Sequence, residues 1–245
     1  MTMLTEPTNA LVLRTRNWMN TSLIVDFYTE KLGRVVATCR GARRLALTTQ
    51  GTIQTLTIGE ATFNLTKKGT ASLRIFYPLE HLAPLEGDLR RFVAAETISE
   101  HMLTATPQMV ADEKLWRYGV AALRACRDGA DALSVAAAYL LCALKNEGVL
   151  PDSTCCNLCQ APLPQNAFCL EDGRFACSGC ARNRQALRVE PALINALASL
   201  NAERLPRLKL GAKRAAHLLL LADALLSVHF QLTLRTVRRL ASLVL

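Results

Sequence analysis

The sequence predicts an α+β protein, in which an N-terminal barrel of five strands is followed by a helical domain with an inserted four-cysteine zinc knuckle. Apolar and polar residues alternate over residues 9–77, as they do in half-buried strands. From residue 86 onward the apolar residues recur at helical spacing, and two Cys-x-x-Cys pairs lie within residues 156–180. We expect the barrel domain in residues 1–80, the helical domain in 81–150 and 182–245, and the knuckle in 151–181.

The barrel prediction depends on five short strands, which we place at residues 11–16, 21–28, 34–40, 56–65 and 72–77. Gly33 supplies the turn before the third strand, and Pro78 ends the fifth. In the fourth strand the apolar parity switches at Gly59 and Glu60, which predicts a β-bulge. Such strands suit a small closed barrel of the oligonucleotide-binding (OB) fold, and an SH3-like barrel is the competing structure.

The expected outer surface of this barrel is basic. Cationic residues fall on outward strand positions, in the loop after the third strand and in the turn before the fifth: Arg14, Arg16, Arg34, Arg40, Arg43, Arg44, Lys67 and Lys68. Such barrels hold single strands with Arg and Lys along the phosphates and with aromatic side chains for stacking. We expect Trp18 and Tyr28 to be available for stacking, and Phe27, Phe63 and Tyr77 to pack in the core.

The helical pattern has a central member and a basic end. Helices are predicted from residue 89 to Pro107 and at 115–126, 132–146, 189–200 and 212–230. The segment 132–146 is apolar nearly all round, so it should be buried at the centre. Residues 234–245 mix apolar residues with arginines and should form a basic amphipathic tail. The four histidines stand singly and are expected to be packed or surface residues.

Two pairs of cysteines have the spacing of a metal site. Cys156 and Cys159 form the first pair, and Cys177 and Cys180 form the second. This spacing is typical of a tetrahedral four-thiolate site for one structural zinc ion. The residues between the pairs can form a small hairpin that turns at Gly173. Cys155 offers an alternative first ligand.

The N-terminus indicates where these cysteines reside. Residues 1–20 include Glu6, Arg14 and Arg16 and lack a continuous apolar stretch, so we expect no secretion signal. We therefore expect a cytoplasmic, nucleoid-associated protein, in which cysteines bind zinc rather than form disulfides.

The net charge of +9 is concentrated at the two ends of the chain. Residues 1–80 carry +5, 81–150 carry −2, 151–180 carry −2 and 181–245 carry +8. Two basic ends predict nucleic acid as the partner. The candidate second surface contains Arg204, Arg207, Lys209, Lys213, Arg214, Arg235, Arg238 and Arg239. Because a second strand is repelled by the first, we expect strand annealing to need both ends.

Several enzyme classes lack their signatures here. The sequence has no Gly-x-x-x-x-Gly-Lys-Ser/Thr loop, no His-Glu-x-x-His motif and no His-x-Glu with Pro-Cys-x-x-Cys. We therefore expect no enzymatic activity, no catalytic residues and no organic cofactor. Two alternatives remain open, which are a zinc-dependent enzyme that modifies nucleic acid and a zinc-containing transcription regulator.

Four segments resemble the family of the bacterial DNA repair protein RecO. Residues 21–34 (TSLIVDFYTEKLGR) with 41–44 (GARR) resemble the family's N-terminal signature. Residues 147–151 (EGVLP), leading into the first cysteine pair, resemble its approach to the knuckle, and residues 225–240 resemble its C-terminal helix. The chain departs from the family at Gln160, where a Gly often follows the second cysteine.

The resemblance implies a non-catalytic recombination mediator. Members of that family bind single- and double-stranded DNA and anneal complementary strands. They act with RecR and RecF to load RecA onto strands coated by single-stranded DNA-binding protein, whose acidic C-terminal tail they bind. These activities and partners are what the resemblance leads us to expect for this chain.

Overall fold

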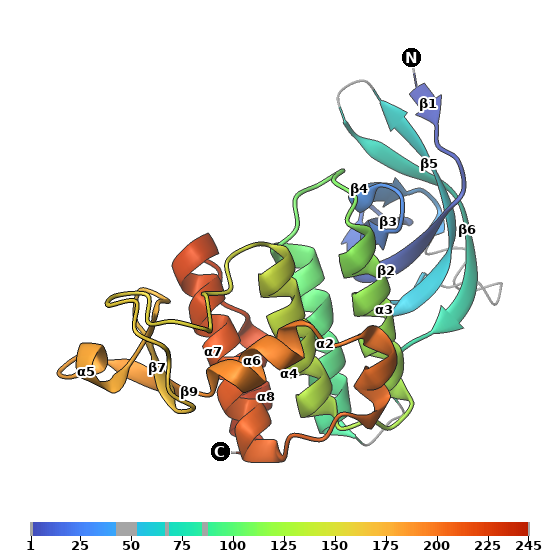
Figure 1. Ribbon diagram of the computed structural model, residues 1–245. Coiled ribbons are helices and arrows are strands. Elements are labelled where there is room, and N and C mark those ends of the chain that lie inside the picture. The colour runs from blue at the N-terminus through green and yellow to red at the C-terminus, as the bar shows by residue number, and fades with distance from the viewer. Residues whose placement is uncertain (1, 43–52, 67–68, 85–87, 245) are drawn as a thin grey trace.

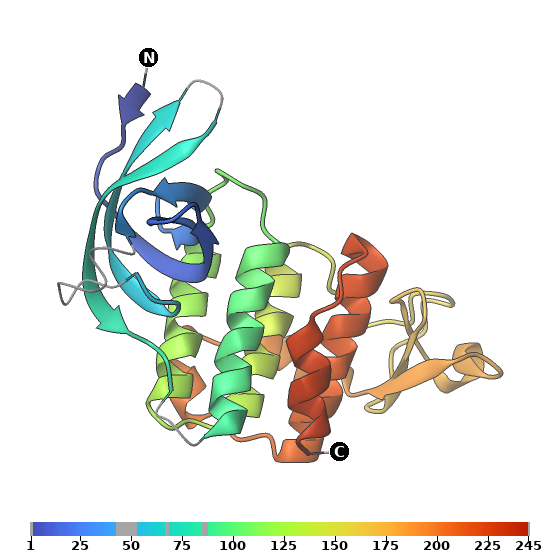
Figure 2. The same ribbon diagram turned by 180° about the vertical axis from the view of Figure 1, so that it is seen from behind.

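The computed structural model describes residues 2–42, 53–66, 69–84 and 88–244 and has three parts (Figure 1). A barrel lies at one side, a body of helices lies in the middle, and a small knuckle projects from the body on the side away from the barrel. The view from behind shows the same order (Figure 2).

The barrel is a sheet closed on itself. Its strands are β1 (Thr2–Leu4), β2 (Thr8–Trp18), β3 (Ser22–Thr29), β4 (Gly33–Cys39), β5 (Thr57–Thr66) and β6 (Ala71–His81). The order is β1-β5-β2-β3-β4-β6, and β6 also pairs with β5, which closes five strands into a ring. The pairing of β4 with β6 is parallel and the others are antiparallel. The predicted five-stranded OB-type barrel is confirmed, and β1 is an additional strand on its edge.

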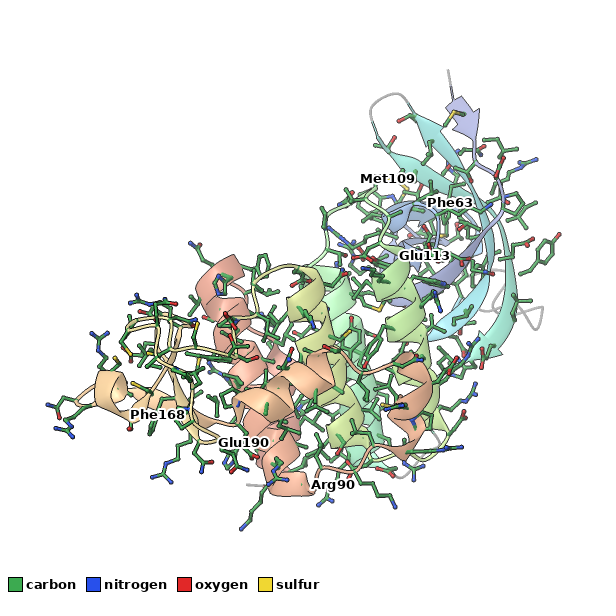
Figure 3. The ribbon with its side chains drawn as sticks, in the orientation of Figure 1. Phe63, Arg90, Met109, Glu113, Phe168 and Glu190 are labelled. Atoms are coloured by element: carbon green, nitrogen blue, oxygen red, sulfur yellow. The ribbon has the colours of Figure 1, made fainter. Side chains whose placement is uncertain are left out.

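The barrel interior holds small apolar residues around an aromatic pair. Phe27 and Phe63 meet edge to face with ring centroids 5.3 Å apart, which confirms their predicted place in the core. Phe76 packs beside them at 5.8 Å from Phe27. Figure 3 shows Phe63 within the barrel. The edge-to-face arrangement is the favoured geometry for aromatic pairs.

The first half of β2 and the start of β5 are buried on both faces. Ala10 and Ala61 point into the barrel, whereas Leu11, Leu56 and Ile58 belong to the core of the helical body. The switch of apolar parity in β5 therefore marks a change from one core to the other. The register of β5 with β6 shifts between Ile58 and Gly59, next to the predicted bulge, and the extra residue at this irregularity belongs to β6.

The fifth barrel strand continues past Pro78 to His81, so the predicted end at Pro78 is wrong. In this part β6 pairs only with β5, because its pairing with β4 is confined to Ala71 and Ser72. The free edge needs no backbone donor, which explains why proline is tolerated there.

The helical body is built from α2 (Leu89–Thr104), α3 (Glu113–Arg127), α4 (Ala132–Asn146), α6 (Pro191–Ala198), the 3₁₀ helix η1 (Ala202–Arg207), α7 (Ala212–Phe230) and α8 (Arg235–Ser242). Asp88, Asp112 and Asp131 cap α2, α3 and α4 by accepting a hydrogen bond from the backbone N–H three residues later. Helix α4 lies at the centre, as predicted, and packs against α2, α3, α6 and α7. No helix in the described part of the chain is long and apolar enough to span a membrane.

The knuckle contains β7 (Ala167–Leu170), β8 (Phe175–Ala176), α5 (Ser178–Ala181) and β9 (Ala186–Val189). Strands β7 and β8 form the predicted hairpin, which turns at Gly173 with a φ of 82°. Strand β9 was not predicted. It pairs with β7 and leads from the knuckle into α6.

The barrel is fixed to the body along the start of β4. The backbone N–H of Met109 donates to the carbonyl of Arg34, and the Arg34 Nε donates to the carbonyl of Thr106. Met109 lies beside the barrel on the segment between α2 and α3 (Figure 3). Gly33 has a φ of +67°, and a Cβ placed on it would lie 1.9 Å from the carbonyl oxygen of Val110. Only glycine allows this approach.

We expect Gly33→Ala to destabilise the protein more than Gly41→Ala does. Gly41 has a similar φ of +70°, but its Cβ would meet nothing within 4 Å. The control substitution therefore carries only the left-handed strain, about 1–2 kcal/mol. Gly33→Ala adds the clash with the Val110 carbonyl. Urea unfolding measures the difference in stability. Equal losses of stability in the two variants would show that the contact between Gly33 and the Val110 carbonyl does not require glycine.

Candidate nucleic-acid interface and metal centre

Three predicted DNA-binding arginines surround a buried carboxylate. Asp26 is 1% exposed, and its Oδ2 accepts from the Nε of Arg14 at 3.0 Å and from an Nη of Arg16 at 3.1 Å. An Nη of Arg34 lies 3.7 Å from the Asp26 Oδ1. Arg34 was expected to be exposed on the outer face of the barrel, but only 18% of its side chain is accessible, because this face of the barrel meets the body. Arg14 and Arg16 remain about half exposed beyond the carboxylate.

The remaining barrel cations fall into two groups. Arg40 is exposed just after β4 and has no carboxylate partner among the described residues. Arg43, Arg44, Lys67 and Lys68 lie outside the described residues. Among the predicted barrel cations that the structure describes, Arg40 is therefore the clearest candidate for contact with a phosphate.

A groove of about 440 Å³ joins the barrel to the C-terminal helix. Arg14 and Leu56 line it from the barrel, and Arg235 and Arg239 line it from α8. Residues from the two basic ends of the sequence thus face one space. Sequence spacing could not show this, because α8 reaches the barrel only by packing on α2.

Two carboxylates also line this groove. Glu100 accepts from the backbone N–H groups of Arg235 and Thr236 at 3.2 and 3.0 Å, so it caps α8 from the neighbouring helix. Glu96 is partly buried, and this burial raises its pKa above the ordinary value while Arg239 opposes the shift. The positive charge of Arg14, Arg235 and Arg239 therefore faces one carboxylate that is already hydrogen-bonded and one whose ionisation is disfavoured.

The predicted C-terminal cluster divides between two sides of the body. Arg204, Arg207 and Lys209 lie on or just after η1, which packs against α3 and α4. Helix α8 packs instead against α2 and α7. The two groups do not form one surface (Figures 1 and 2).

Two arginines of this cluster have acidic partners. Arg214 lies at the start of α7, next to the exposed Lys213, and its Nε is 3.2 Å from a carboxylate oxygen of Glu190. Arg238 Nε lies 3.8 Å from Asp223, whose other carboxylate oxygen accepts from the backbone N–H of Leu234. Arg235 and Arg239 are thus the cations of α8 that remain available to the groove.

The aromatic predictions reverse at two positions. Tyr28 is fully buried and stacks on Trp116 of α3, and burial raises the pKa of its hydroxyl. It joins the barrel to the body and is not available for stacking on a base. Tyr77, expected in the core, is 60% exposed on the outside of β6, and Trp18 is exposed as expected.

The four predicted cysteines meet in the knuckle. The sulfurs of Cys156, Cys159, Cys177 and Cys180 all lie within 4.8 Å of one another, and those of Cys159 and Cys177 are 3.9 Å apart. A tetrahedral four-thiolate zinc site places its sulfurs about 3.8 Å apart. Cys155 is outside this group, with its sulfur turned to Asp152 and Gln160.

The backbone around these sulfurs is arranged for thiolates. Burial disfavours ionisation of Cys156, but backbone N–H groups of Cys159, Cys177 and Leu158 outweigh it and lower the pKa to about 6. The pKa of Cys177 is also lowered, chiefly by the backbone N–H of Cys180. Contacts with the neighbouring sulfurs raise the pKa of Cys180 to about 12. Such a site fits a metal ion, which would displace the last protons.

Asn157 helps to bring the two pairs together. Its side-chain oxygen accepts a hydrogen bond from the backbone N–H of Phe175, and its backbone N–H donates to the Phe175 carbonyl. Gln160 has a φ of 62°, so it adopts the left-handed conformation at the place where the family often has glycine.

Sequence reasoning missed a cavity of about 250 Å³ between α3, α4 and η1. Tyr118, Tyr139 and Cys142 line it, and Lys114 and Arg117 lie on its exposed rim. Its lining comes from segments distant in sequence, so no local motif marks it. An apolar cavity with a cationic rim can accept an apolar group that is attached to an acidic chain.

The chain matches two protein-family models. "Recombination protein O N terminal" matches residues 1–98, and "Recombination protein O C terminal" matches residues 86–238. The DNA repair protein RecO of Syntrophobacter fumaroxidans is 28% identical over 215 residues, which cover 84% of this chain and 85% of the relative. The DNA repair protein RecO of Syntrophus aciditrophicus is 23% identical over 211 residues, which cover 80% and 77%.

We expect the joint substitution of Arg14, Arg16 and Arg34 by Gln to destabilise the barrel. It leaves the buried Asp26 carboxylate without a cation, which costs about 3–5 kcal/mol for buried pairs. Adding Asp26→Asn removes that charge and should restore much of the stability. Urea unfolding of the triple and quadruple variants measures both effects, and a quadruple variant no more stable than the triple would contradict them.

Proposed function

The chain belongs to the RecO family of recombination proteins, and on this premise we propose that it is a non-catalytic mediator of DNA repair. In this proposal it binds single- and double-stranded DNA and anneals complementary strands. The observation that carries the proposal is the groove in which Arg14 of the barrel faces Arg235 and Arg239 of α8. A closed OB-type barrel beside a second basic element provides two places for phosphates on one body.

Annealing requires that two polyanions approach each other. Cations that neutralise phosphates on both strands reduce their repulsion, and holding both strands on one protein raises their effective concentration. We assign one strand to the exposed barrel side around Arg40 and the other to the α8 side of the groove. The predicted residues Arg43, Arg44, Lys67 and Lys68 belong to the barrel part of this proposal.

We propose that the four knuckle cysteines hold one structural zinc ion. The distances between their sulfurs suit tetrahedral coordination, and the backbone N–H groups favour thiolates. Bound zinc would crosslink the two cysteine pairs and stabilise the knuckle fold. Four sulfur donors fill a tetrahedral site, so a substrate has no position on such a metal. This donor set favours a mediator over the alternative of a zinc-dependent enzyme.

We further propose the partners that the family suggests. RecR and RecF would act with this chain to load RecA onto single strands coated by single-stranded DNA-binding protein, in the cytoplasm at the nucleoid. The cavity between α3, α4 and η1 supports the acidic tail of that protein as a ligand. Lys114 and Arg117 would face the acidic residues, and the apolar lining would bury the end of the tail.

We expect purified protein to contain one zinc ion per chain, and Cys156→Ser to lose it. Cys155→Ser is the matched control, because its sulfur lies outside the cluster and should leave the zinc content unchanged. Cys156→Ser should also make the knuckle sensitive to protease, while the helical body stays folded because its helices pack on one another. Elemental analysis gives the zinc content, and wild-type protein free of zinc when prepared without chelator would refute the assignment.

We expect the double substitution of Arg235 and Arg239 by Gln to reduce annealing more than it reduces binding to one strand. Binding should persist on the barrel, whereas the annealing rate should fall by roughly tenfold because the second strand loses its counter-charge. The log–log salt slope of binding should fall by at most about 1.4, the value for two lost single-strand contacts. Fluorescence measurements without nucleotide follow both properties.

The control removes the same charge elsewhere. Arg238 lies on α8 but pairs with Asp223 of α7, and Arg90 lies at the start of α2, so their joint substitution by Gln should leave annealing near the wild-type rate. The full-length chain is needed, since truncation after β6 would expose Leu11, Leu13 and Ile58. If the Arg235 and Arg239 variant annealed at the wild-type rate while folded, the two-surface mechanism would be wrong.

A further inference from the structure

Three exposed arginines of the knuckle have no role in the proposed function. Arg182 and Arg184 lie between α5 and β9, and Arg188 lies on β9. All three are exposed, and none has a carboxylate partner among the described residues. The charge of the cysteine-bearing segment is negative, so sequence reasoning treated the knuckle as structural only.

The turn that carries Arg182 and Arg184 has a defined conformation. Ala181 packs in the small core of the knuckle with Cys156, and the backbone N–H of Arg184 donates to the Ala181 carbonyl at 3.1 Å. Arg182 has φ and ψ of −57° and 132°, and Asn183 has a φ of 61°. These values describe a type II turn with asparagine at its left-handed position. The turn begins one residue after Cys180 and is therefore held by the metal site.

Arg188 belongs to the same side of the knuckle. It pairs with Phe168 in the register of β7 and β9. Ala186, two residues earlier on β9, packs in the same small core as Ala181, and residues two apart on a strand share a face. The three arginines thus border one small core. Figure 3 shows Phe168 in the knuckle, far from Phe63 in the barrel.

Two of the nearby acidic residues, Asp172 and Glu190, are already engaged. Asp172 accepts from Arg174 at 2.6 Å, and this hydrogen bond is the main cause that lowers its pKa, with a smaller effect of Arg184. Glu190 pairs with Arg214, and Glu171 lines a groove against α7. Three arginines on a turn and a strand therefore give a net positive charge to this part of the knuckle, which lies on the side of the body away from the barrel (Figures 1 and 2).

We infer that Arg182, Arg184 and Arg188 form a phosphate-binding site for single-stranded DNA, at which a strand held by the barrel makes a second, distant contact. This inference rests on the proposed function, because it takes the ligand to be the DNA that the barrel binds. Arginine offers planar, bidentate donors that match phosphate oxygens. A strand shorter than the distance between barrel and knuckle cannot use this site, whereas a longer strand can.

The test is a salt titration with two lengths of oligothymidine on full-length protein. One strand has a length within the site size of a single OB barrel, about 4–16 nucleotides, and the other is three times as long. Joint substitution of Arg182, Arg184 and Arg188 by Gln should reduce the log–log salt slope by about 2 on the long strand, three contacts at about 0.7 each. The slope on the short strand should not change.

Two further variants keep the result interpretable. Joint substitution of Arg90, Arg124 and Lys145 by Gln removes the same charge from exposed positions on α2, α3 and α4 and should keep the long-strand slope. Limited proteolysis reports whether the knuckle stays folded. If the triple arginine variant opens the knuckle, Arg188→Gln alone is used, and its expected loss of slope is about 0.7.

The outcomes separate the two proposals. If wild-type protein binds neither strand, the proposed function fails. If it binds both and the folded arginine variant keeps the full slope on the long strand, the inference about the knuckle is wrong and the proposed function stands. The inference about the knuckle is also wrong if that variant loses binding to an acidic peptide while its salt slope on the long strand is unchanged. The three arginines would then contact protein.

Discussion

Burial of the outer faces of β2 and β5 against the helices is the constraint on which this structure depends. Leu11, Leu13, Leu56 and Ile58 come from the barrel, yet they belong to the core of the helical body. Full burial of one such side chain is worth about 1.5–3 kcal/mol. Barrel and body therefore stabilise each other, and the orientation of one relative to the other is fixed by packing. That fixed orientation places Arg14 opposite α8.

The sequence was a good guide where the pattern is local. Alternation of apolar and polar residues located the barrel strands, helical spacing located α2, α3, α4 and α7, and the two Cys-x-x-Cys pairs located the sulfur cluster. Each of these signals involves residues that are close in the chain. It misled where distant segments decide whether a strand face is covered. Tyr28 occupies an outward position on β3 but is covered by Trp116, and Tyr77 shares an apolar pattern with the core but faces solvent. Alternation tells which residues share a face but not what covers that face.

The candidate site shows the same limit for charge. Counting cations identified two basic ends, but it could not tell that Asp26 draws three arginines of the barrel together, or that the C-terminal cations divide between η1 and α8. The groove, the cavity beside Tyr118 and the exposed turn at Asn183 all arise from contacts between distant segments. Net charge per segment therefore indicates the class of partner, whereas the location of a binding surface requires the fold.

Helix α8 lacks a cap of its own, since Leu234 precedes it, and its first backbone N–H groups are satisfied by Glu100. These partners are separated by 135 and 136 residues. A helix of eight residues is too short to be stable alone in water. Helix α8 must therefore form after α2 is already in place. A segment made long after the barrel completes the groove, so a chain truncated before α8 carries the barrel without its facing basic helix.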